Sequence, residues 1–210
     1  MNDGVEMVVF DLGGVVMTHT AALGTLADLI GVPTDRREGF EAVYYRHRLF
    51  YDLTSDAAGY WSRVAADGGA PGVPDDEAVA ELVRVDNAGW SVPDPATLVL
   101  IDDLVATGIP LALLSNAPRS MGAVFHAQPW SASFGHAIFS GDVGVVKPDR
   151  SIFLELLRRT GLPAAATVFI DDRDENVSGA RDVGLRGIRF TDAAALRTEL
   201  IALGLPFAGR

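Results

Sequence analysis

Reactive polar side chains occur in this sequence where short apolar segments end. Asp11 follows the apolar segment 5–10, Ser115 and Asn116 follow the segment 109–114, and Asp171 and Asp172 follow the segment 167–170. Lys147 lies in the loop after a weaker segment, 136–139. Ligands of open α/β sheets bind beyond the carboxyl ends of the strands, so we expect these groups to meet at one edge of a sheet.

The chemistry expected of this group is phosphoryl transfer. Clustered carboxylates repel one another unless a cation lies among them, and aspartate oxygens suit Mg²⁺ bound together with a substrate phosphate. An aspartate can also act as a nucleophile and form a covalent intermediate. Lys147, Ser115 and the backbone amide of Asn116 could hold and neutralise the phosphoryl oxygens during in-line transfer.

The segments that carry these residues predict a Rossmann-like α/β fold. The four apolar segments, together with 187–190, have the length and near-continuous apolar character of parallel strands covered on both faces. Helical patterns alternate with them at 94–107, 149–159, 175–183 and 192–203. Such alternation favours a parallel sheet with helices on both sides.

Residues 18–90 interrupt the alternation. Only helical periodicity is found there, at about 18–30, 38–51, 55–67 and 75–87. A helical segment inserted after the first strand is a candidate lid over the site. We therefore predict an α/β core formed by residues 1–17 and 91–210 and a helical cap formed by residues 18–90.

Four motifs, taken in order, resemble those of the haloacid dehalogenase (HAD) superfamily of hydrolases. They are Val-Val-Phe-Asp-Leu-Gly-Gly-Val-Val at 8–16, Leu-Leu-Ser-Asn at 113–116, Lys-Pro at 147–148 and Val-Phe-Ile-Asp-Asp-Arg-Asp-Glu-Asn at 168–176. Within the superfamily the chain is most similar to the glucose-1-phosphate phosphatases and to the phosphatase domain of soluble epoxide hydrolase. The helical segment matches the cap of that group.

The resemblance assigns a role to each motif residue. It implies that Asp11 is the nucleophile and a Mg²⁺ ligand, and that Lys147 pairs with Asp11 and with the phosphoryl group. It implies that Ser115 and Asn116 bind the phosphoryl group, that the Gly13 carbonyl and Asp172 ligate the metal, and that Asp171 and Asn176 support the site. The implied reaction is Mg²⁺-dependent hydrolysis of a small phosphorylated metabolite, such as a sugar phosphate, through an aspartyl phosphate.

One departure from the family pattern concerns the proton donor. Most phosphatases of the superfamily carry a second aspartate where this chain has Gly13, and general acid–base help is typically worth ~10²–10⁴-fold. The substrate could have a good leaving group, another residue such as His47 could substitute, or the chain could be an impaired phosphatase that binds a phosphorylated ligand. A metal-independent 2-haloacid dehalogenase is a further alternative, but it carries small hydroxyl residues where this chain has Asp171 and Asp172.

The other candidate residues favour structural roles. A cluster in the predicted cap mixes aromatic and basic side chains, and we expect most of them to pack or to be solvated, with one of Arg46, His47 and Arg48 as a possible substrate contact. That cluster comprises Tyr44, Tyr45, Arg46, His47, Arg48 and Tyr51. Packing is expected for Trp61 and Trp90, and structural roles for His19, His126 and His136. For Arg119, a solvated position and an anion contact are equally expected.

Composition narrows the classes of partner. The chain has 210 residues, of which 28 are acidic and 17 basic, giving a net charge of −11, and it has no cysteine. A basic footprint is absent, which argues against nucleic acid and anionic membranes as partners. Residues 1–6 lack the basic region of a signal peptide, and no apolar stretch is long enough to span a bilayer. We expect a cytoplasmic protein, and the sequence carries no prediction of oligomeric state.

Overall fold

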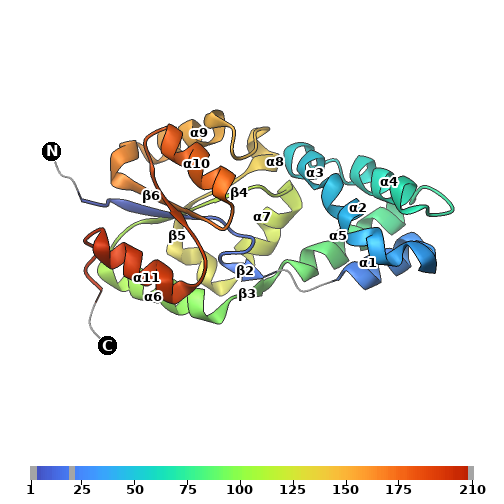
Figure 1. Cartoon of the computed structure of the whole chain (residues 1–210), viewed down its shortest axis with the longest axis horizontal. Helices are drawn as coiled ribbons and strands as arrows, with labels where there is room; N and C mark the ends of the chain where they lie inside the picture. The colour runs from blue at the N-terminus through green and yellow to red at the C-terminus, as the bar shows by residue number, and fades with distance from the viewer. Residues whose placement is uncertain (1–3, 19–21, 208–210) are drawn as a thin grey trace.

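A parallel sheet forms the centre of the molecule. The structure, a computed structural model, describes residues 4–18 and 22–207. The sheet has the strand order β5-β4-β1-β6-β7, and all neighbouring strands are parallel (Figure 1). Its strands are β1 (Met7–Phe10), β4 (Leu111–Ser115), β5 (Phe134–Phe139), β6 (Thr167–Asp171) and β7 (Arg186–Arg189). Each overlaps a predicted strand, so the predicted α/β fold is confirmed.

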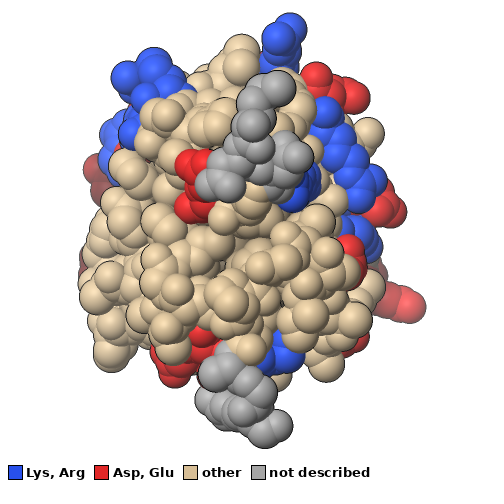
Figure 2. Space-filling model, turned by 90° about the vertical axis from the view of Figure 1, so that its left-hand side faces the viewer, with Lys and Arg blue, Asp and Glu red and all other residues tan. Residues whose placement is uncertain are grey.

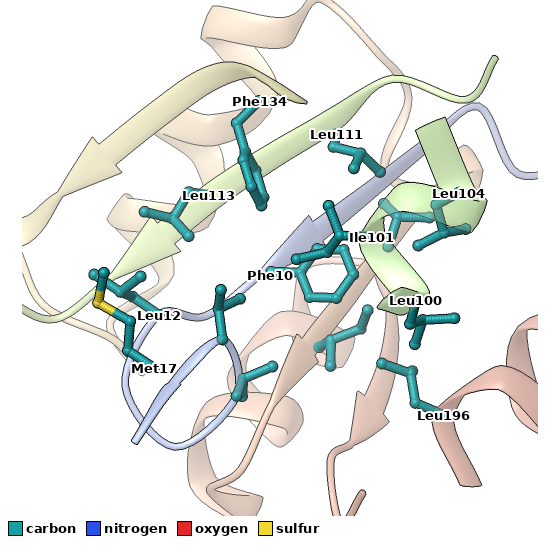
Figure 3. Close-up of a cluster of buried hydrophobic side chains, with 14 of the residues drawn as sticks. Phe10, Leu12, Met17, Leu100, Ile101, Leu104, Leu111, Leu113, Phe134 and Leu196 are labelled. Atoms are coloured by element: carbon teal, nitrogen blue, oxygen red, sulfur yellow. The ribbon is translucent and has the colours of Figure 1, made fainter. Parts of the chain in front are cut away.

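Alternation along the strands supplies both faces of the sheet with apolar side chains. In β1, Val8 and Phe10 belong to one buried cluster, whereas Met7 and Val9 belong to another. Figure 3 shows the first cluster, in which Leu100, Ile101 and Leu104 of one helix lie against the Phe10 face. Successive side chains of a strand point to opposite faces, which is why continuous apolar segments are buried on both sides.

Helices cover both faces of this sheet. The first cluster includes side chains from α6 (Pro95–Thr107), α7 (Arg119–His126) and α11 (Ala193–Ala202). The second includes side chains from α9 (Arg150–Thr160) and α10 (Asp174–Asp182). The predicted helices 94–107, 149–159, 175–183 and 192–203 correspond to α6, α9, α10 and α11. A four-residue helix, α8 (Ser140–Val143), follows β5, and short 3-10 helices span Thr34–Gly39, Pro129–Ser133 and Ala164–Ala166.

The helices of the predicted cap lie together beyond the carboxyl end of the sheet (Figure 1). They are α1 (Leu23–Ile30), α2 (Phe40–Arg46), α3 (Arg48–Thr54), α4 (Ala57–Gly68) and α5 (Asp76–Gly89), and we call them the cap helices. They enclose an apolar cluster of their own, which includes Tyr44, Tyr60 and Trp61. The first residues of the predicted helix 18–30, including His19, lie outside the described residues.

One prediction within the cap was wrong. The segment 38–51 is not a single helix, because α2 ends at Arg46 and α3 begins at Arg48. His47 forms the junction, with φ −102° and ψ 0°. The break separates Arg46 and His47, which both contact Asp67, from Arg48, which is turned inward.

A short antiparallel pair connects the cap helices to the core. β2 (Met17–Thr18) pairs with β3 (Val92–Pro93), so the two segments that join the core to the cap helices lie side by side. The sequence analysis did not predict this pair, because each strand has only two residues. It lies at the predicted limits of the cap, 17/18 and 90/91, and the division into two domains at these limits stays a prediction.

The surface of the described residues carries charges of both signs. Figure 2 views the end of the core that lies away from the cap helices, and there arginine side chains lie near aspartate and glutamate side chains. The middle of this face is largely uncharged. Among the described residues, every helix is too short or too polar to cross a membrane.

Candidate active site

Asp11 lies directly after the central strand of the sheet. Its Oδ1 accepts a hydrogen bond of 2.7 Å from the Leu12 backbone amide, and only 7% of the residue is exposed. Because β4 and β6 flank β1, their carboxyl ends bring Ser115 and Asp171 to either side of Asp11. The expected meeting of strand-end residues at one sheet edge is therefore found.

Lys147 is the only lysine of the sequence and lies buried beneath Asp11. Its Nζ lies 2.9 Å from Asp11 Oδ1 and 2.6 Å from Asp171 Oδ2, and it donates to the Leu114 carbonyl at 2.9 Å. An ammonium group has three donors, and these three acceptors engage all of them. The adjacent carboxylates raise the pKa of Lys147 although burial opposes this, so the lysine is charged.

Ser115 and Asn116 differ in what their side chains do. Asn116 exchanges two hydrogen bonds with the backbone of Lys147: its Nδ2 donates to the Lys147 carbonyl at 2.8 Å, and its Oδ1 accepts from the Lys147 amide at 2.7 Å. The Asn116 side chain thus fixes the loop that carries Lys147 against the end of β4. Within residues 4–18 and 22–207, no hydrogen bond of the Ser115 hydroxyl is found, and both residues line a cavity described below.

Two adjacent aspartates after β6 occupy different environments. Asp171 is fully buried, and its carboxylate accepts from Lys147, from Asn176 Nδ2 at 3.0 Å to both oxygens, and from the Arg173 amide at 2.9 Å. Asp172 is half-buried and lines the cavity. Asp171 therefore holds Lys147 and the following loop, whereas Asp172 faces the space where a ligand would bind.

The three carboxylates form the one cluster among the described residues that is suited to a metal ion. Oxygen atoms of Asp11, Asp171 and Asp172 all lie within 4.8 Å of one another. Burial raises the pKa of Asp11 to about 7, with Lys147 opposing and Asp171 adding to the rise. Burial and the neighbouring Asp171 also raise the pKa of Asp172. One ammonium faces three carboxylates, so the site favours an additional cation.

Gly13 and Gly14 form a tight turn after Asp11. The Gly14 amide donates to the Met17 carbonyl at 2.8 Å, and Gly14 has φ +77°. A Cβ atom on Gly14 would lie 2.6 Å from Asp172 Oδ2, so a side chain here would collide with the carboxylate. At Gly13, a Cβ atom would lie 3.0 Å from the ring of Trp90. The position at which the family pattern has a second aspartate is therefore closed by an indole.

A cavity of about 630 Å³ lies between the sheet edge and the cap helices. Its core side is formed by Asp11, Leu12, Gly13, Gly14, Met17, Trp90, Ser115, Asn116, Ala117, Met121, Asp172, Arg173 and Asn176, and its cap side by Tyr45, Arg48, Leu49 and Asp52. The wall combines the polar strand-end groups with a broad apolar part. Lys147 does not line this cavity but lies behind Asp11, so the structure places it against the nucleophile candidate rather than in the ligand space.

Of the three basic cap candidates, Arg48 is the one that reaches the cavity. Its side chain is 12% exposed, with Nε 2.9 Å from Asp52 Oδ1 and Nη1 2.8 Å from Asp86 Oδ2. Arg46 and His47 instead each lie 2.9 Å from Asp67 Oδ2. His47, the suggested replacement for the missing acid, therefore lies off the cavity.

The remaining candidates have largely structural environments. Trp61 is fully buried among the cap helices, as expected, whereas Trp90 packs on the core and also lines the cavity. Arg119 pairs with Asp142 at 2.9 Å and lies off the cavity. His126 and His136 belong to no metal-ligating cluster of the described residues.

The sequence analysis missed Asp52. It is buried, carried near the end of α3, and contributes to the cavity wall. A signal was present, because Arg48 and Asp52 are four residues apart and such pairs lie side by side on a helix. The predicted helix 38–51, however, ended one residue before Asp52.

Asp11 thus follows the central strand of a parallel sheet, faces the buried Lys147 and lies close to Asp171 and Asp172. A model of the haloacid dehalogenase-like hydrolases matches residues 5–184, and the chain belongs to this family. The predicted family is thereby confirmed. The narrower resemblance to glucose-1-phosphate phosphatases stays a prediction.

Individual relatives are similar over different shares of the chain. A sesquiterpene phosphatase of Aspergillus oryzae is 26% identical over 93% of this chain and 94% of its own length. A flavin mononucleotide hydrolase of Arabidopsis thaliana is 29% identical over 61% of this chain and 51% of its own length. The first name describes a phosphatase and the second a hydrolase of flavin mononucleotide.

Solved structures share the fold. The L-2-haloacid dehalogenase of Xanthobacter autotrophicus superposes with a TM-score of 0.69 at 20% identity, covering 96% of this chain and 84% of that one. A HAD family enzyme of Bacteroides thetaiotaomicron, solved with magnesium and inorganic phosphate, gives a TM-score of 0.66 at 19% identity over 92% and 99% of the two chains. Since a fold hosts many activities, these likenesses establish architecture, and the activity must be argued from the site.

Proposed function

We propose that this hydrolase is a Mg²⁺-dependent phosphatase that cleaves a small phosphate monoester through an aspartyl phosphate on Asp11. The observation that carries the proposal is the cluster of Asp11, Asp171 and Asp172 within 4.8 Å, faced by the buried ammonium of Lys147. A nucleophilic carboxylate beside excess negative charge needs a cation before it can approach a phosphate dianion.

The donor set fits Mg²⁺. It consists of oxygen ligands, and the deficit of positive charge among three carboxylates and one lysine matches a divalent ion. Asp11 and Asp172 would hold the ion, together with the carbonyl of Gly13, while Asp171 and Asn176 keep the surrounding loop in place. Bound Mg²⁺ would supply charge neutralisation for the phosphoryl oxygens.

The chain's own residues would carry the remaining steps. Asp11 attacks phosphorus and displaces the alcohol, and water then hydrolyses the aspartyl phosphate. Ser115 and Asn116 both line the cavity, and the Ser115 hydroxyl and the backbone amide of Asn116 would bind the phosphoryl oxygens. Lys147 would orient Asp11 from behind, because its three donors are directed to Asp11, Asp171 and the Leu114 carbonyl.

The apolar part of the cavity favours an apolar alcohol over a sugar. Leu12, Met17, Leu49, Met121 and Trp90 line the wall. Arg48, the basic residue on the cap side of the cavity, is paired with Asp52 and Asp86. A prenyl or terpenyl monophosphate suits such a wall, and the similarity to a sesquiterpene phosphatase supports the same class.

Turnover of p-nitrophenyl phosphate tests the reaction, and a panel of prenyl, sugar and flavin monophosphates tests the substrate class. We expect hydrolysis with Mg²⁺, loss on chelation, and a decrease of about 10³-fold or more in Asp11→Asn. Prenyl monophosphates should give the highest kcat/KM of the panel. The control is Asp142→Asn, an exposed aspartate that lies off the cavity.

Two other results would replace the proposal. Halide release from 2-chloropropionate without a metal would indicate a dehalogenase. Binding of phosphate esters without turnover of any of them would indicate an impaired phosphatase that serves as a binding protein.

A further inference from the structure

Cleavage of an alkyl phosphate needs a proton for the leaving oxygen, because an alkoxide is a poor leaving group. Gly13 has no side chain to supply it, and the ring of Trp90 occupies the adjoining space. Asp11 is the proposed nucleophile and Asp172 a proposed metal ligand. Among the described residues that line the cavity, the one further carboxyl group belongs to Asp52.

The backbone of Asp52 is fixed to the core beside the phosphoryl-binding loop. The Ser140 hydroxyl donates to the Asp52 carbonyl at 2.6 Å and accepts from the Ala117 amide at 2.9 Å. Ala117 directly follows Asn116, so one hydroxyl links Asp52 to the loop that would hold the phosphate. Three residues further on, Ser55 Oγ accepts from the Arg119 amide at 2.9 Å and anchors the end of α3 to the core.

The side chain of Asp52 is held by one oxygen. Arg48 Nε donates to Oδ1 at 2.9 Å, and the side chain is 9% exposed. Within residues 4–18 and 22–207, no hydrogen bond reaches Oδ2. The carboxyl group is thus oriented by the guanidinium through one oxygen, on a residue that lines the cavity.

The charges around Asp52 allow both protonation states near neutral pH. Burial raises its pKa to about 6, Arg48 opposes the rise, Asp86 adds to it, and the more distant Arg173 opposes it. Arg48 is also shared with Asp86 and with the Tyr44 hydroxyl, at 2.8 and 2.7 Å. The positive charge of Arg48 therefore stabilises the carboxylates of both Asp52 and Asp86.

The neighbouring phenols carry no charge in this range. Burial raises the pKa of Tyr51 and of Tyr60 above the ordinary value of 10.0, and the negative charge of Asp52 adds to the rise. A proton donor that works at neutral pH needs a pKa near that pH, so that it can give the proton and take it back.

We propose that Asp52 is the acid and base of the hydrolysis, acting from the cap rather than from the core; this inference rests on the proposed phosphatase activity. As Asp11 oxygen bonds to phosphorus and the ester P–O bond breaks, the Asp52 carboxyl gives its proton to the departing alkoxide. In the second step the water oxygen bonds to phosphorus, the bond between phosphorus and the Asp11 oxygen breaks, and the water gives a proton to the Asp52 carboxylate. Asp11 and Asp52 are then both regenerated, with alcohol and phosphate released.

Two substrates of similar shape test this role in Asp52→Asn. The leaving group of p-nitrophenyl phosphate is an acidic phenol that departs without a proton, whereas p-nitrobenzyl phosphate releases an alkoxide. We expect kcat/KM of the variant to fall about 10²–10⁴-fold for the benzyl ester and less than about threefold for the aryl ester. The control is Asp67→Asn, the same change at an exposed cap aspartate off the cavity.

A merely structural role for Asp52 gives a different result. Loss of a structural contact lowers the rates of both esters by the same factor, and that outcome overturns the proposal, as does an unchanged benzyl rate. The kcat/KM ratio of wild type to variant on the benzyl ester adds a second readout, in which ionisation of the substrate cancels. It should decrease as the pH rises above about 6, because the acid form of Asp52 is lost.

Failure of the proposed function is distinguishable from failure of this inference. If wild type hydrolyses neither ester with Mg²⁺, or if Asp11→Asn keeps its rate, the phosphatase proposal is wrong. If wild type hydrolyses both esters and Asp52→Asn changes the rates of the benzyl and aryl esters by the same factor, the phosphatase proposal stands. Asp52 then has no role in proton transfer.

Discussion

The ring of Trp90 lies 3.0 Å from the position that a Cβ atom would take at Gly13. The same indole donates from Nε1 to the Tyr44 hydroxyl at 3.0 Å. Trp90 thus contacts the turn after Asp11 on one side and helix α2 of the cap on the other. The absence of a side chain at Gly13 therefore leaves room for the indole that links the core to the cap helices.

A double-mutant cycle measures this contact. We expect Gly13→Ala to lower the free energy of unfolding by about 1–3 kcal/mol, because the added methyl group is forced against the indole. In a Trp90→Ala background the same change should cost much less, with an interaction energy of at least about 0.5 kcal/mol by urea denaturation. Gly24→Ala is the control, since nothing lies within 4 Å of its Cβ position. Additive effects at positions 13 and 90 would contradict the contact.

Removal of the buried ammonium should destabilise the core. In Lys147→Met, Asp11 and Asp171 lose their shared cation, and leaving buried charges unpaired typically costs about 3–5 kcal/mol. The exposed pair of Arg119 and Asp142 offers the comparison, and Arg119→Met should cost less than about 1 kcal/mol. Chemical denaturation of both variants without added metal makes the measurement. An equal loss of free energy of unfolding in the two variants would mean that Lys147 does not stabilise the carboxylate cluster.

Mg²⁺ should stabilise the folded chain by mass action. At a hundredfold excess over its Kd, a ligand specific for the native state adds about 2.7 kcal/mol to the free energy of unfolding, which raises the melting temperature. Asp172→Asn should weaken this shift, whereas Asp142→Asn should keep it, because Asp142 is outside the carboxylate cluster. Melting curves over a Mg²⁺ titration test both variants. A shift that is equal in wild type and Asp172→Asn would place the ion elsewhere.

The stability of the wild type relative to Asp52→Asn should depend on pH. Folding raises the pKa of Asp52 from 3.8 to about 6, so the native state binds this proton more tightly than the unfolded state. The wild type therefore loses free energy of unfolding relative to the variant as the pH rises from about 4 to about 6, by on the order of 1–3 kcal/mol. Urea denaturation at several pH values gives the difference, and a difference that stays constant contradicts the raised pKa.

Strand positions and the strand-end acids were readable from the sequence because their signals are local. The apolar run before Asp11 and the run before Asp171 each specify a buried strand within a few residues, and parallel strands bring their carboxyl ends together. The motif order then indicated the family, which the family match confirms.

The roles of cap residues could not be read in this way. Helical periodicity indicated that Arg46, His47 and Arg48 lie on a helix, but it did not show the break at His47, where α2 and α3 both pack on α4 and Arg48 reaches Asp86 of α5. That break directs Arg46 and His47 to Asp67 and Arg48 to the cavity. Packing between segments, not the pattern within one, decides which side chain is turned inward.

The sequence alone determined the sheet, its helices and the gathering of Asp11, Lys147 and the β6 aspartates, because short apolar runs and strand ends specify these locally. Only the tertiary structure decided that Asp171 holds the lysine while Asp172 faces the cavity, that Trp90 closes the space at Gly13, and that Asp52 joins the cavity wall. The physical reason is distance along the chain. Such contacts join residues separated by tens of positions, and their geometry depends on the packing of the whole fold.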